Sequence, residues 1–202
     1  MQLNYNNEYF QIDNTISSIN TIFEKVNNTL ENKNIVFSHL IIDGVEVYVN
    51  HEEHIKTRIN EIETIEIVTR NVKEMIWDTM ESIHSYLQRA IPALTELVDE
   101  SYENFSKKSW DGINQLAEGM QWILQFMEVT RTAPQQPVNW KEMEKSLQQC
   151  ETSFAQLLEA VEAKDTILIS DILSYEVTPA YESLEKNLAV SLDDEEYLKH
   201  VN

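Results

Sequence analysis

Glycine, proline and cysteine are scarce in this chain of 202 residues, which has 3 glycines, 4 prolines and 1 cysteine. Few glycines leave little room for all-β turn chemistry or for the glycine-rich loops that cradle phosphate groups. The single cysteine, Cys150, cannot form an intramolecular disulfide, and no cation stands next to it in sequence to activate its thiol. The sequence therefore favours helices and a cytoplasmic location, and it disfavours a cysteine nucleophile.

Basic residues are also few, since 15 lysines and arginines stand against 35 acidic residues and give a formal charge of −20. Such a chain is repelled by nucleic acid and by anionic membranes, which bind through lysine and arginine. No apolar run approaches the ~20 residues of a membrane helix. The start, MQLNYNNEYFQ, lacks the positive and apolar regions of a signal peptide. We expect a protein partner, for which the charge allows a basic one, or a second copy of the chain.

Residues 1–70 mix short strand and helix patterns. The clearest is IVFSHLIIDGVEVYVN, where two β-branched runs flank Asp43-Gly44, the pair that best accepts a type I′ hairpin turn. The other elements are strands in EYFQID (8–13) and TIEIVT (64–69), a helix carrying Ile16, Ile19, Phe23, Val26 and Leu30, and a short helix in HEEHIKTRINEI (51–62). The order β-α-β-β-α-β predicts a ferredoxin-like domain, whose antiparallel sheet carries both helices on one face.

From residue 71 onward the strand pattern stops, and apolar residues recur at helical spacing. Four long segments joined by short loops predict an up-down four-helix bundle over residues 71–202, with the acidic tail DDEEYLKHVN at its end. Asp165 is expected to cap the fourth helix. Pro92 and Pro179 are expected to kink their helices, because proline removes a backbone donor and clashes with the preceding turn.

Several side-chain groups could hold a metal. Glu81-Ser-Ile-His84 has the form of one half of a di-iron motif, but the only other histidine of the bundle is His200 in the tail. His51 and His54, with Glu52, Glu53 and His39, form an alternative zinc set. The competing interpretation of Glu81 and His84 is a surface pair one helical turn apart. The competing interpretation of His51 and His54 is that they lie at a helix N-terminus, which favours acidic neighbours.

The carboxylates offer an alternative function. Glu100-Ser-Tyr-Glu103 and Glu162-Ala-Lys-Asp165 have the form of the paired motifs with which all-α nucleotide pyrophosphohydrolases chelate magnesium. Both pairs fall at expected helix ends, where convergence of their oxygens on one ion is not assured. A Mg²⁺- or Mn²⁺-dependent hydrolase is therefore the alternative to a non-enzymatic protein.

Two further groups are candidates for contact rather than catalysis. Trp77 and Trp122 fall beside the main apolar stripes, so they could extend an exposed apolar surface for a partner. The competing interpretation is that they pack at the joint between the bundle and the N-terminal domain. In DTILISDILSYEVTPAY, Asp171 lies one turn from Tyr175 on the same face. We expect Asp171, Tyr175 and Glu176 to be polar residues at a packing joint of a kinked helix.

The segments EGMQWIL (118–124), KDTILISDILSYEVTPAYESL (164–184) and FSHLIIDGVEVY (37–48) resemble motifs of a family of uncharacterised small proteins from Gram-positive spore-forming bacteria. The resemblance covers most of the chain and implies no known activity, so it assigns no catalytic residue. Together with the absence of a recognisable cofactor motif, it leads us to predict a non-enzymatic cytoplasmic interaction or scaffold protein without a cofactor.

Overall fold

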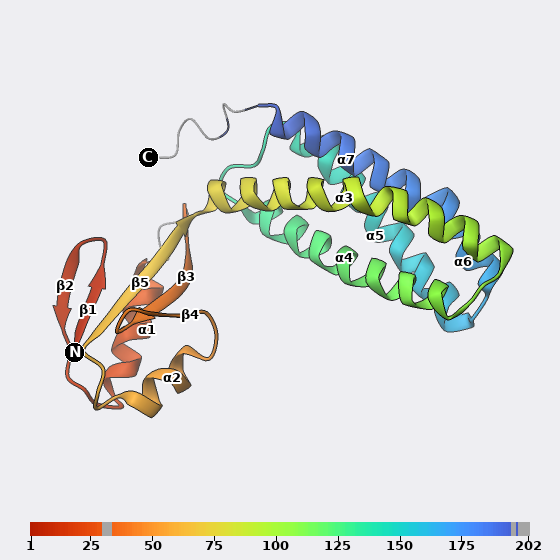
Figure 1. Cartoon of the computed structure of the whole chain (residues 1–202). Coiled ribbons are helices and arrows are strands. Elements are labelled where there is room, and N and C mark those ends of the chain that lie inside the picture. The colour runs from red at the N-terminus through yellow and green to blue at the C-terminus, as the bar shows by residue number, and fades with distance from the viewer. Residues whose placement is uncertain (30–33, 195–196, 198–202) are drawn as a thin grey trace. The chain divides into compact units, whose positions relative to one another are not determined.

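The computed structural model describes residues 1–29, 34–194 and 197, and it is α+β (Figure 1). The chain divides into two compact units, Met1–Glu74 and Met75–Asn202. The sequence patterns placed the boundary between residues 70 and 71. Each unit is described separately below.

The N-terminal unit is a five-stranded sheet with two helices. Its strand order is β2-β1-β5-β3-β4, and β1 pairs parallel with β5 while the other neighbours are antiparallel. The elements are β1 (Gln2–Tyr5), β2 (Glu8–Gln11), α1 (Ser18–Thr29), β3 (Ile35–Ile42), β4 (Val45–Val47), α2 (His51–Arg58) and β5 (Thr64–Asn71).

This sheet differs from the antiparallel ferredoxin-like sheet that the element order predicted. The difference arises from β1, a strand that the sequence patterns missed. Leu3 is 1% exposed and lies opposite Ile65 in the parallel pair, so its burial places β1 between β2 and β5. Asn6 and Asn7 both have positive φ, which allows the tight turn into β2. The predicted first strand is therefore the second strand of a hairpin.

Both helices pack on one face of the sheet, where one apolar core joins the elements, and β2 contributes the partly buried Phe10 to it. Alternate residues of the strands point into it, as expected from the two-residue period. Ile16 is exposed and precedes α1, and Leu30 lies outside the described residues. The buried residues of this core are Leu3, Ile19, Ile22, Val26, Leu40, Ile42, Val47, Ile55, Ile59, Ile62, Ile65 and Ile67.

The predicted hairpin at Asp43-Gly44 is confirmed, with φ of 49° and 81°. The Asp43 carboxylate also joins the hairpin to β5, because its Oδ1 accepts hydrogen bonds from the backbone N–H groups of Glu63 (2.9 Å) and Thr64 (2.8 Å). Partial burial acts to raise the pKa of Asp43, but these bonds and nearby Arg58 outweigh it and hold the pKa below its usual value.

The C-terminal unit is helical. Its long helix α3 leads away from β5, and α4 returns antiparallel beside it (Figure 1). A π-helical segment joins α6 to α7 without a break. The elements are α3 (Val72–Glu103), α4 (Lys107–Thr132), α5 (Trp140–Ala163), α6 (Thr166–Ile172), the π-helix η1 (Leu173–Val177) and α7 (Thr178–Leu192). No helix among the described residues is long and apolar enough to cross a membrane.

Three of these helix starts have side-chain caps. At the start of α3 the Asn71 Oδ1 accepts a hydrogen bond from the backbone N–H of Lys73 at 2.8 Å. Ser106 and Ser109 form a capping box at the start of α4. The predicted cap at Asp165 is confirmed, since its Oδ1 accepts from the backbone N–H of Leu168 at 3.0 Å. These caps satisfy backbone donors that would otherwise lack partners in the first turn.

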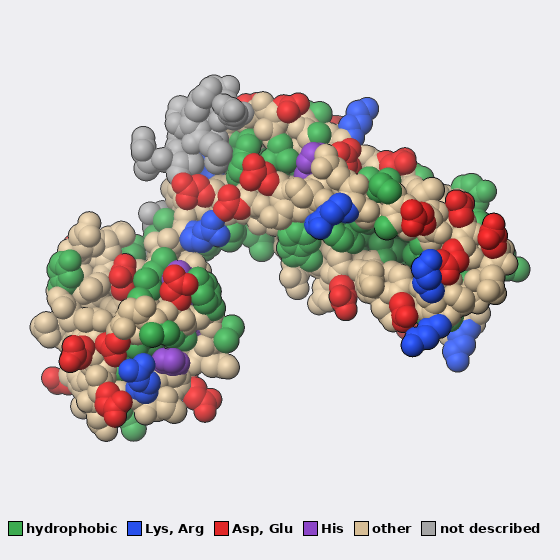
Figure 2. Space-filling model, in the orientation of Figure 1, with side chains coloured by type: hydrophobic (Ala, Val, Ile, Leu, Met, Phe, Trp, Pro, Cys, Tyr) green, Lys and Arg blue, Asp and Glu red, His purple; other side chains and the backbone are tan. Residues whose placement is uncertain are grey.

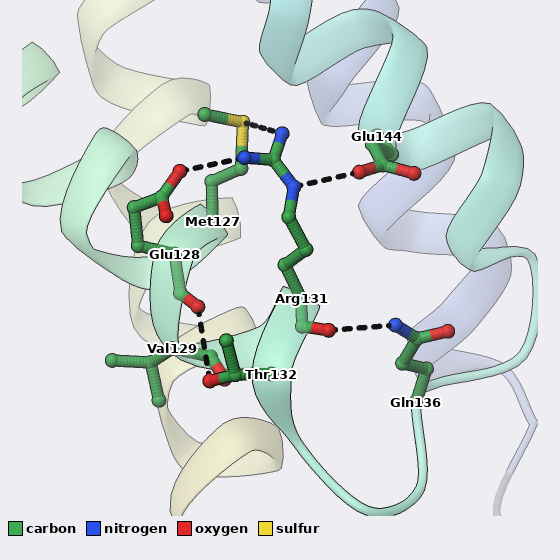
Figure 3. Close-up of polar contacts among 7 residues, drawn as sticks. All are labelled: Met127, Glu128, Val129, Arg131, Thr132, Gln136 and Glu144. Carbon is green, nitrogen blue, oxygen red and sulfur yellow. Dashed lines mark hydrogen bonds and ion pairs between the residues drawn. The ribbon is translucent and has the colours of Figure 1, made fainter.

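Arg131 closes the end of α4 against α5 (Figure 3). Its guanidinium donates to Glu128 (2.7 Å) and to Glu144 of α5 (2.9 Å), while its carbonyl accepts from the Gln136 side chain at 3.2 Å. The hydrogen bond with Glu144 is the main cause that raises the pKa of Arg131. This cluster joins the end of α4 to α5 and to the segment that connects the two helices.

Candidate functional site

A surface furrow lies between α3 and α4, and we take it as the candidate site. Figure 2 shows hydrophobic side chains along it, with acidic and basic side chains at its edges. Its larger hollow has a volume of about 510 Å³. The apolar residues of this hollow are Ala90, Ala93, Leu94, Leu97, Gly112 and Leu116.

The furrow exists because small residues occupy both facing helices. A Cβ at Gly112 would lie 2.9 Å from Cδ1 of Leu97, at the flexible end of that side chain. A Cβ at Gly119 would lie only 2.0 Å from the Tyr86 hydroxyl and 2.4 Å from its Cζ. Glycine costs about 1 kcal/mol relative to alanine inside a helix. The close approach of Tyr86 explains why glycine occupies position 119 in spite of this cost.

Tyr86 stands at the centre of the furrow. Its ring packs edge to face with Trp122 (6.2 Å between centroids) and with the fully buried Tyr181 (6.4 Å). Burial raises the pKa of Tyr86. Burial, and then the neighbouring Tyr86, raise the pKa of Tyr181. Tyr86 therefore connects the furrow to the core of the helical unit.

Tyr86 and Arg89 separate the larger hollow from a second one of about 410 Å³, because both line the two hollows. The Arg89 Nε donates to the backbone carbonyl of Ser85 at 3.1 Å, and no ion pair of Arg89 is found in the described part of the chain. The second hollow is lined by Glu81, Ser82, Ser85, Tyr86, Arg89 and Trp122.

The far end of the furrow is acidic on balance. Lys108 pairs with Glu100 at 2.5 Å, and this hydrogen bond is the main cause that raises the pKa of Lys108. Glu96 adds a smaller attraction to Lys108. Asp111 lines the same hollow from α4. One lysine thus stands among three carboxylates at this end.

The structure places the two predicted tryptophans differently. Trp122 is half-buried and lines the second hollow. Trp77 is only 9% exposed and stacks on Tyr197 at 6.4 Å between centroids. Trp77 therefore does not extend an exposed surface, because Tyr197 and the core of the unit cover it.

The predicted polar joint lies at the π-helix. Tyr102 of α3 donates a hydrogen bond to Asp171 at 2.6 Å, and this bond is the main cause that raises the pKa of Tyr102 to about 12. Tyr175 and Glu176 are exposed and line a hollow of about 480 Å³ beside Asp171. Asp171 is therefore partnered by Tyr102.

Both prolines lie within helical stretches. Pro92 is exposed, and α3 continues through it. Pro179 is the second residue of α7, directly after the π-helix, where the backbone N–H of Thr178 donates to the carbonyl of Leu173. Pro179 cannot donate to the Tyr175 carbonyl one turn earlier. The wider π-helical turn accommodates that missing bond.

The predicted metal sets are not assembled. Among the described residues, no group of three or more histidine, cysteine or acidic side chains could hold a metal ion. Glu100 pairs with Lys108, and Asp165 caps α6, while Glu103 and Glu162 are exposed. His84 contacts Glu185 at 3.0 Å rather than a second metal motif. His200 lies outside the described residues.

The histidines of the N-terminal unit lie apart from any carboxylate cage. His51 packs edge-on against Phe37 at 5.3 Å, and His39 stacks on Tyr48 at 4.5 Å. The Nε2 atoms of His39, His51 and His54 are buried without hydrogen-bond partners among the described residues. Glu52 instead pairs with Lys56, and Glu53 is exposed.

Cys150 is fully buried in α5, and burial raises the pKa of its thiol to about 12. Because the thiolate is the reactive form, this environment suits a packing role rather than a nucleophile.

The sequence profile of a family described as a domain of unknown function (DUF8042) matches residues 78–187, which is more than half of the chain. The chain belongs to this family. The DUF8042 region contains both walls of the furrow, the π-helix and the Tyr102–Asp171 bond. Comparison with curated proteins and with solved structures gives no match.

Sequence reasoning named Trp122 as a candidate contact residue and Glu81 and Glu100 as candidate metal ligands, but it did not place these residues in one furrow. The available signal was the pair Gly112 and Gly119, seven residues apart inside a helical pattern. Glycine inside a helix commonly has a packing or functional reason. Ala90 and Ala93 lie on the facing helix, but which side of α3 faces α4 is a tertiary property.

Proposed function

We propose that this protein is a non-enzymatic interaction protein, whose helical unit is an up-down four-helix bundle that binds a helical segment of another protein in the α3–α4 furrow. The carrying observation is the 510 Å³ hollow with an apolar floor and a rim of charges. An amphipathic helix that lays its apolar face into such a groove is a recurring mode of recognition.

The residues of the furrow support this assignment. Tyr86, Arg89 and Trp122 meet at its centre, and tyrosine, arginine and tryptophan are the residue types enriched at binding hot spots. Tyr86 and Trp122 already pack against one another, so little side-chain freedom remains to be lost on binding.

Charge identifies the kind of partner. The chain carries −20, and Glu96, Glu100 and Asp111 outnumber Lys108 at one end of the furrow. A second copy would bring the same negative charge, whereas a partner with net positive charge is attracted and steered towards the site. The occupant is therefore a basic amphipathic helix of a different protein, in the cytoplasm, where the lone thiol stays reduced.

The metal-dependent hydrolase remains the alternative class, but it gains no support from a site. Its four carboxylates, Glu100, Glu103, Glu162 and Asp165, are engaged elsewhere or exposed, as described above. A melting experiment with Mg²⁺ or Mn²⁺ tests it, since an ion at a hundred times its dissociation constant stabilises by about 2.7 kcal/mol.

Blocking the furrow tests the proposal. Ala93 is exposed and lines the larger hollow, while Ala155 is exposed on α5 and lines none of the hollows described here. We therefore compare Ala93→Trp with Ala155→Trp, which add the same side chain to two helix surfaces. The purified variants are used to capture partners from a lysate of the source organism, with light scattering to monitor self-association.

We expect one protein to be captured by the wild type and by Ala155→Trp and to be lost with Ala93→Trp. Equal capture by all three proteins would contradict binding in the furrow. A dimer that Ala93→Trp dissociates would instead identify the second copy as the occupant.

A further inference from the structure

Four charged residues of α3 line the two hollows of the furrow. Glu100 pairs with Lys108, and the other three alternate in sign along the helix. Glu81 lies at the second hollow, Arg89 lines both hollows, and Glu96 lies at the larger one. They are eight and seven positions apart in the sequence. At ~1.5 Å per residue, these intervals are about 12 and about 10 Å along the helix.

These intervals allow a partner to respond to each charge individually. Exposed charges separated by more than about 8 Å are largely screened from one another at physiological salt. A charged group of the partner that lies next to Arg89 therefore interacts mainly with Arg89 and only weakly with Glu81 or Glu96. An interval of seven residues returns to within about 20° of the same side of a helix, and an interval of eight residues to within about 80°, so the three positions stay on one half of the helix surface.

None of the three charges is neutralised by a described ion pair of its own. The Arg89 Nε is held by the Ser85 carbonyl, which leaves the two terminal nitrogens for a carboxylate. Glu81 has no described ion pair, and Glu96 contributes only a secondary attraction to Lys108, which already pairs with Glu100. Asp111 reinforces the negative charge near Glu96 from the opposite wall.

We infer that the partner helix presents a basic, an acidic and a basic residue, in that order, at intervals of seven or eight residues beside its apolar face. This inference rests on the proposed function and specifies its partner. Heptad-spaced charges of this kind select partners in paired helices. The pattern reads the same in both directions, so it holds for either orientation of the partner along α3.

The apolar face of the same partner fills the larger hollow. Ala90, Ala93 and Leu97 line this hollow from α3, and Gly112 faces them from α4. An aliphatic side chain of the partner enters this hollow between the acidic and the second basic position, because Ala90 and Ala93, which line it, lie between Arg89 and Glu96 in the sequence. Binding energy thus comes from apolar burial, while the charge order sets register and specificity.

Two synthetic peptides of identical composition test the inference. Each is a fluorescein-labelled amphipathic helix of about three heptads with leucine on its apolar face. The first carries Lys, Glu and Lys at heptad spacing beside that face, and the second carries Lys, Lys and Glu. Fluorescence anisotropy measures binding to the full chain at low and at physiological salt.

We expect the Lys-Glu-Lys peptide to bind about tenfold more tightly than its permuted form, because the permuted peptide opposes like charges at two positions. The Arg89→Glu variant should lose this preference and should bind best a third peptide in which all three positions are Lys. Ala93→Trp should weaken both of the first two peptides, whereas Ala155→Trp should not.

Equal binding of the two matched peptides, or binding of neither, overturns the inference. If both bind equally and Ala93→Trp still blocks them, the furrow is a docking site that responds to net charge, and the proposed function stands. If they bind but Ala93→Trp has no effect, the furrow itself is wrong, and the proposed function fails with the inference.

Discussion

Replacing the two glycines of α4 by alanine, one at a time, tests how α3 and α4 pack along the furrow. The free energy of unfolding should rise or stay unchanged at Gly112 and should fall at Gly119. An added methyl gains about 1 kcal/mol of helix propensity at either position. At Gly112 the nearest atom is the flexible end of Leu97 at 2.9 Å, which can move into the open hollow. We expect Gly112→Ala to change the free energy of unfolding by between 0 and about +1 kcal/mol.

At Gly119 the methyl cannot coexist with Tyr86, whose hydroxyl and Cζ would lie 2.0 and 2.4 Å away. The ring must leave, and it then loses its edge-to-face contacts with Trp122 and Tyr181. Such contacts contribute about 0.5–1.5 kcal/mol each, and forced repacking costs about 1–3 kcal/mol. After the propensity gain, Gly119→Ala should destabilise the helical unit by about 2 kcal/mol.

Removing Tyr86 should reverse the sign. In a Tyr86→Ala background nothing opposes the new methyl, so Gly119→Ala should stabilise by about 1 kcal/mol. The interaction energy of the double-mutant cycle is then about 3 kcal/mol, well above the error of additivity for independent sites. This cycle separates a specific clash from a general intolerance of α4 to substitution.

Urea unfolding followed by tryptophan fluorescence measures these changes. All four tryptophans lie between residues 77 and 140, so their emission reports the helical unit alone. A stabilising or neutral Gly119→Ala in the wild-type background would refute the placement of Tyr86 over α4. Equal effects of Gly119→Ala in the two backgrounds would refute it as well.

Three further outcomes follow from the polar contacts. Because the pKa of Tyr102 is raised to about 12, the bond to Asp171 stabilises the fold below pH ~10 and is lost as pH rises through 12; Asp171→Asn should reduce this alkaline dependence of the unfolding midpoint. Cys150 should resist iodoacetamide at pH ~8 until the protein is unfolded, since its pKa is about 12; rapid native labelling would contradict its burial. Because the pKa of Asp43 is lowered, its contribution is present above pH ~4 and lost on acidification; Asp43→Ala should cost about 1–3 kcal/mol, and Asp43→Asn, which keeps an acceptor, should cost less, as measured by urea unfolding followed by circular dichroism.

The sequence predicted those parts of the fold that local pattern determines. The positive-φ turn at Asp43-Gly44 needs two residues of suitable type, and the cap at Asp165 needs one side chain before an apolar run. Both are present. The α+β class could also be predicted from local pattern, because the spacing of apolar residues changes from mixed strand and helix periods to helical periods alone near residue 71.

The strand order could not be obtained in this way. β1 has only four residues, and its pairing with β5 depends on a partner more than sixty residues later in the chain. The alternation of Gln2–Tyr5 is too short to be distinguished from a loop. The ferredoxin-like prediction therefore assigned β2 to the place that β1 occupies beside β5.

The candidate site depended even more on tertiary structure. Trp122 was identified because it lies beside the apolar stripe of its helix. Trp77 satisfies the same criterion, yet Tyr197, which is 120 positions later, covers it. A helical pattern shows which residues share a face, but it does not show which faces meet. The hollow beside Gly112 could not be predicted without knowing where α3 lies relative to α4.

Photo-crosslinking from the furrow tests the central claim most directly. A benzophenone amino acid replaces Gln115, which is exposed and lines the larger hollow, or Gln148, which is exposed on α5 and lines none of the hollows described here. After irradiation with captured partner, mass spectrometry identifies the crosslinked segment. The account predicts a basic, amphipathic helical segment of another protein crosslinked from position 115 and not from 148. The same yield from both positions, or a crosslink from 148 alone, would contradict a docking site between α3 and α4.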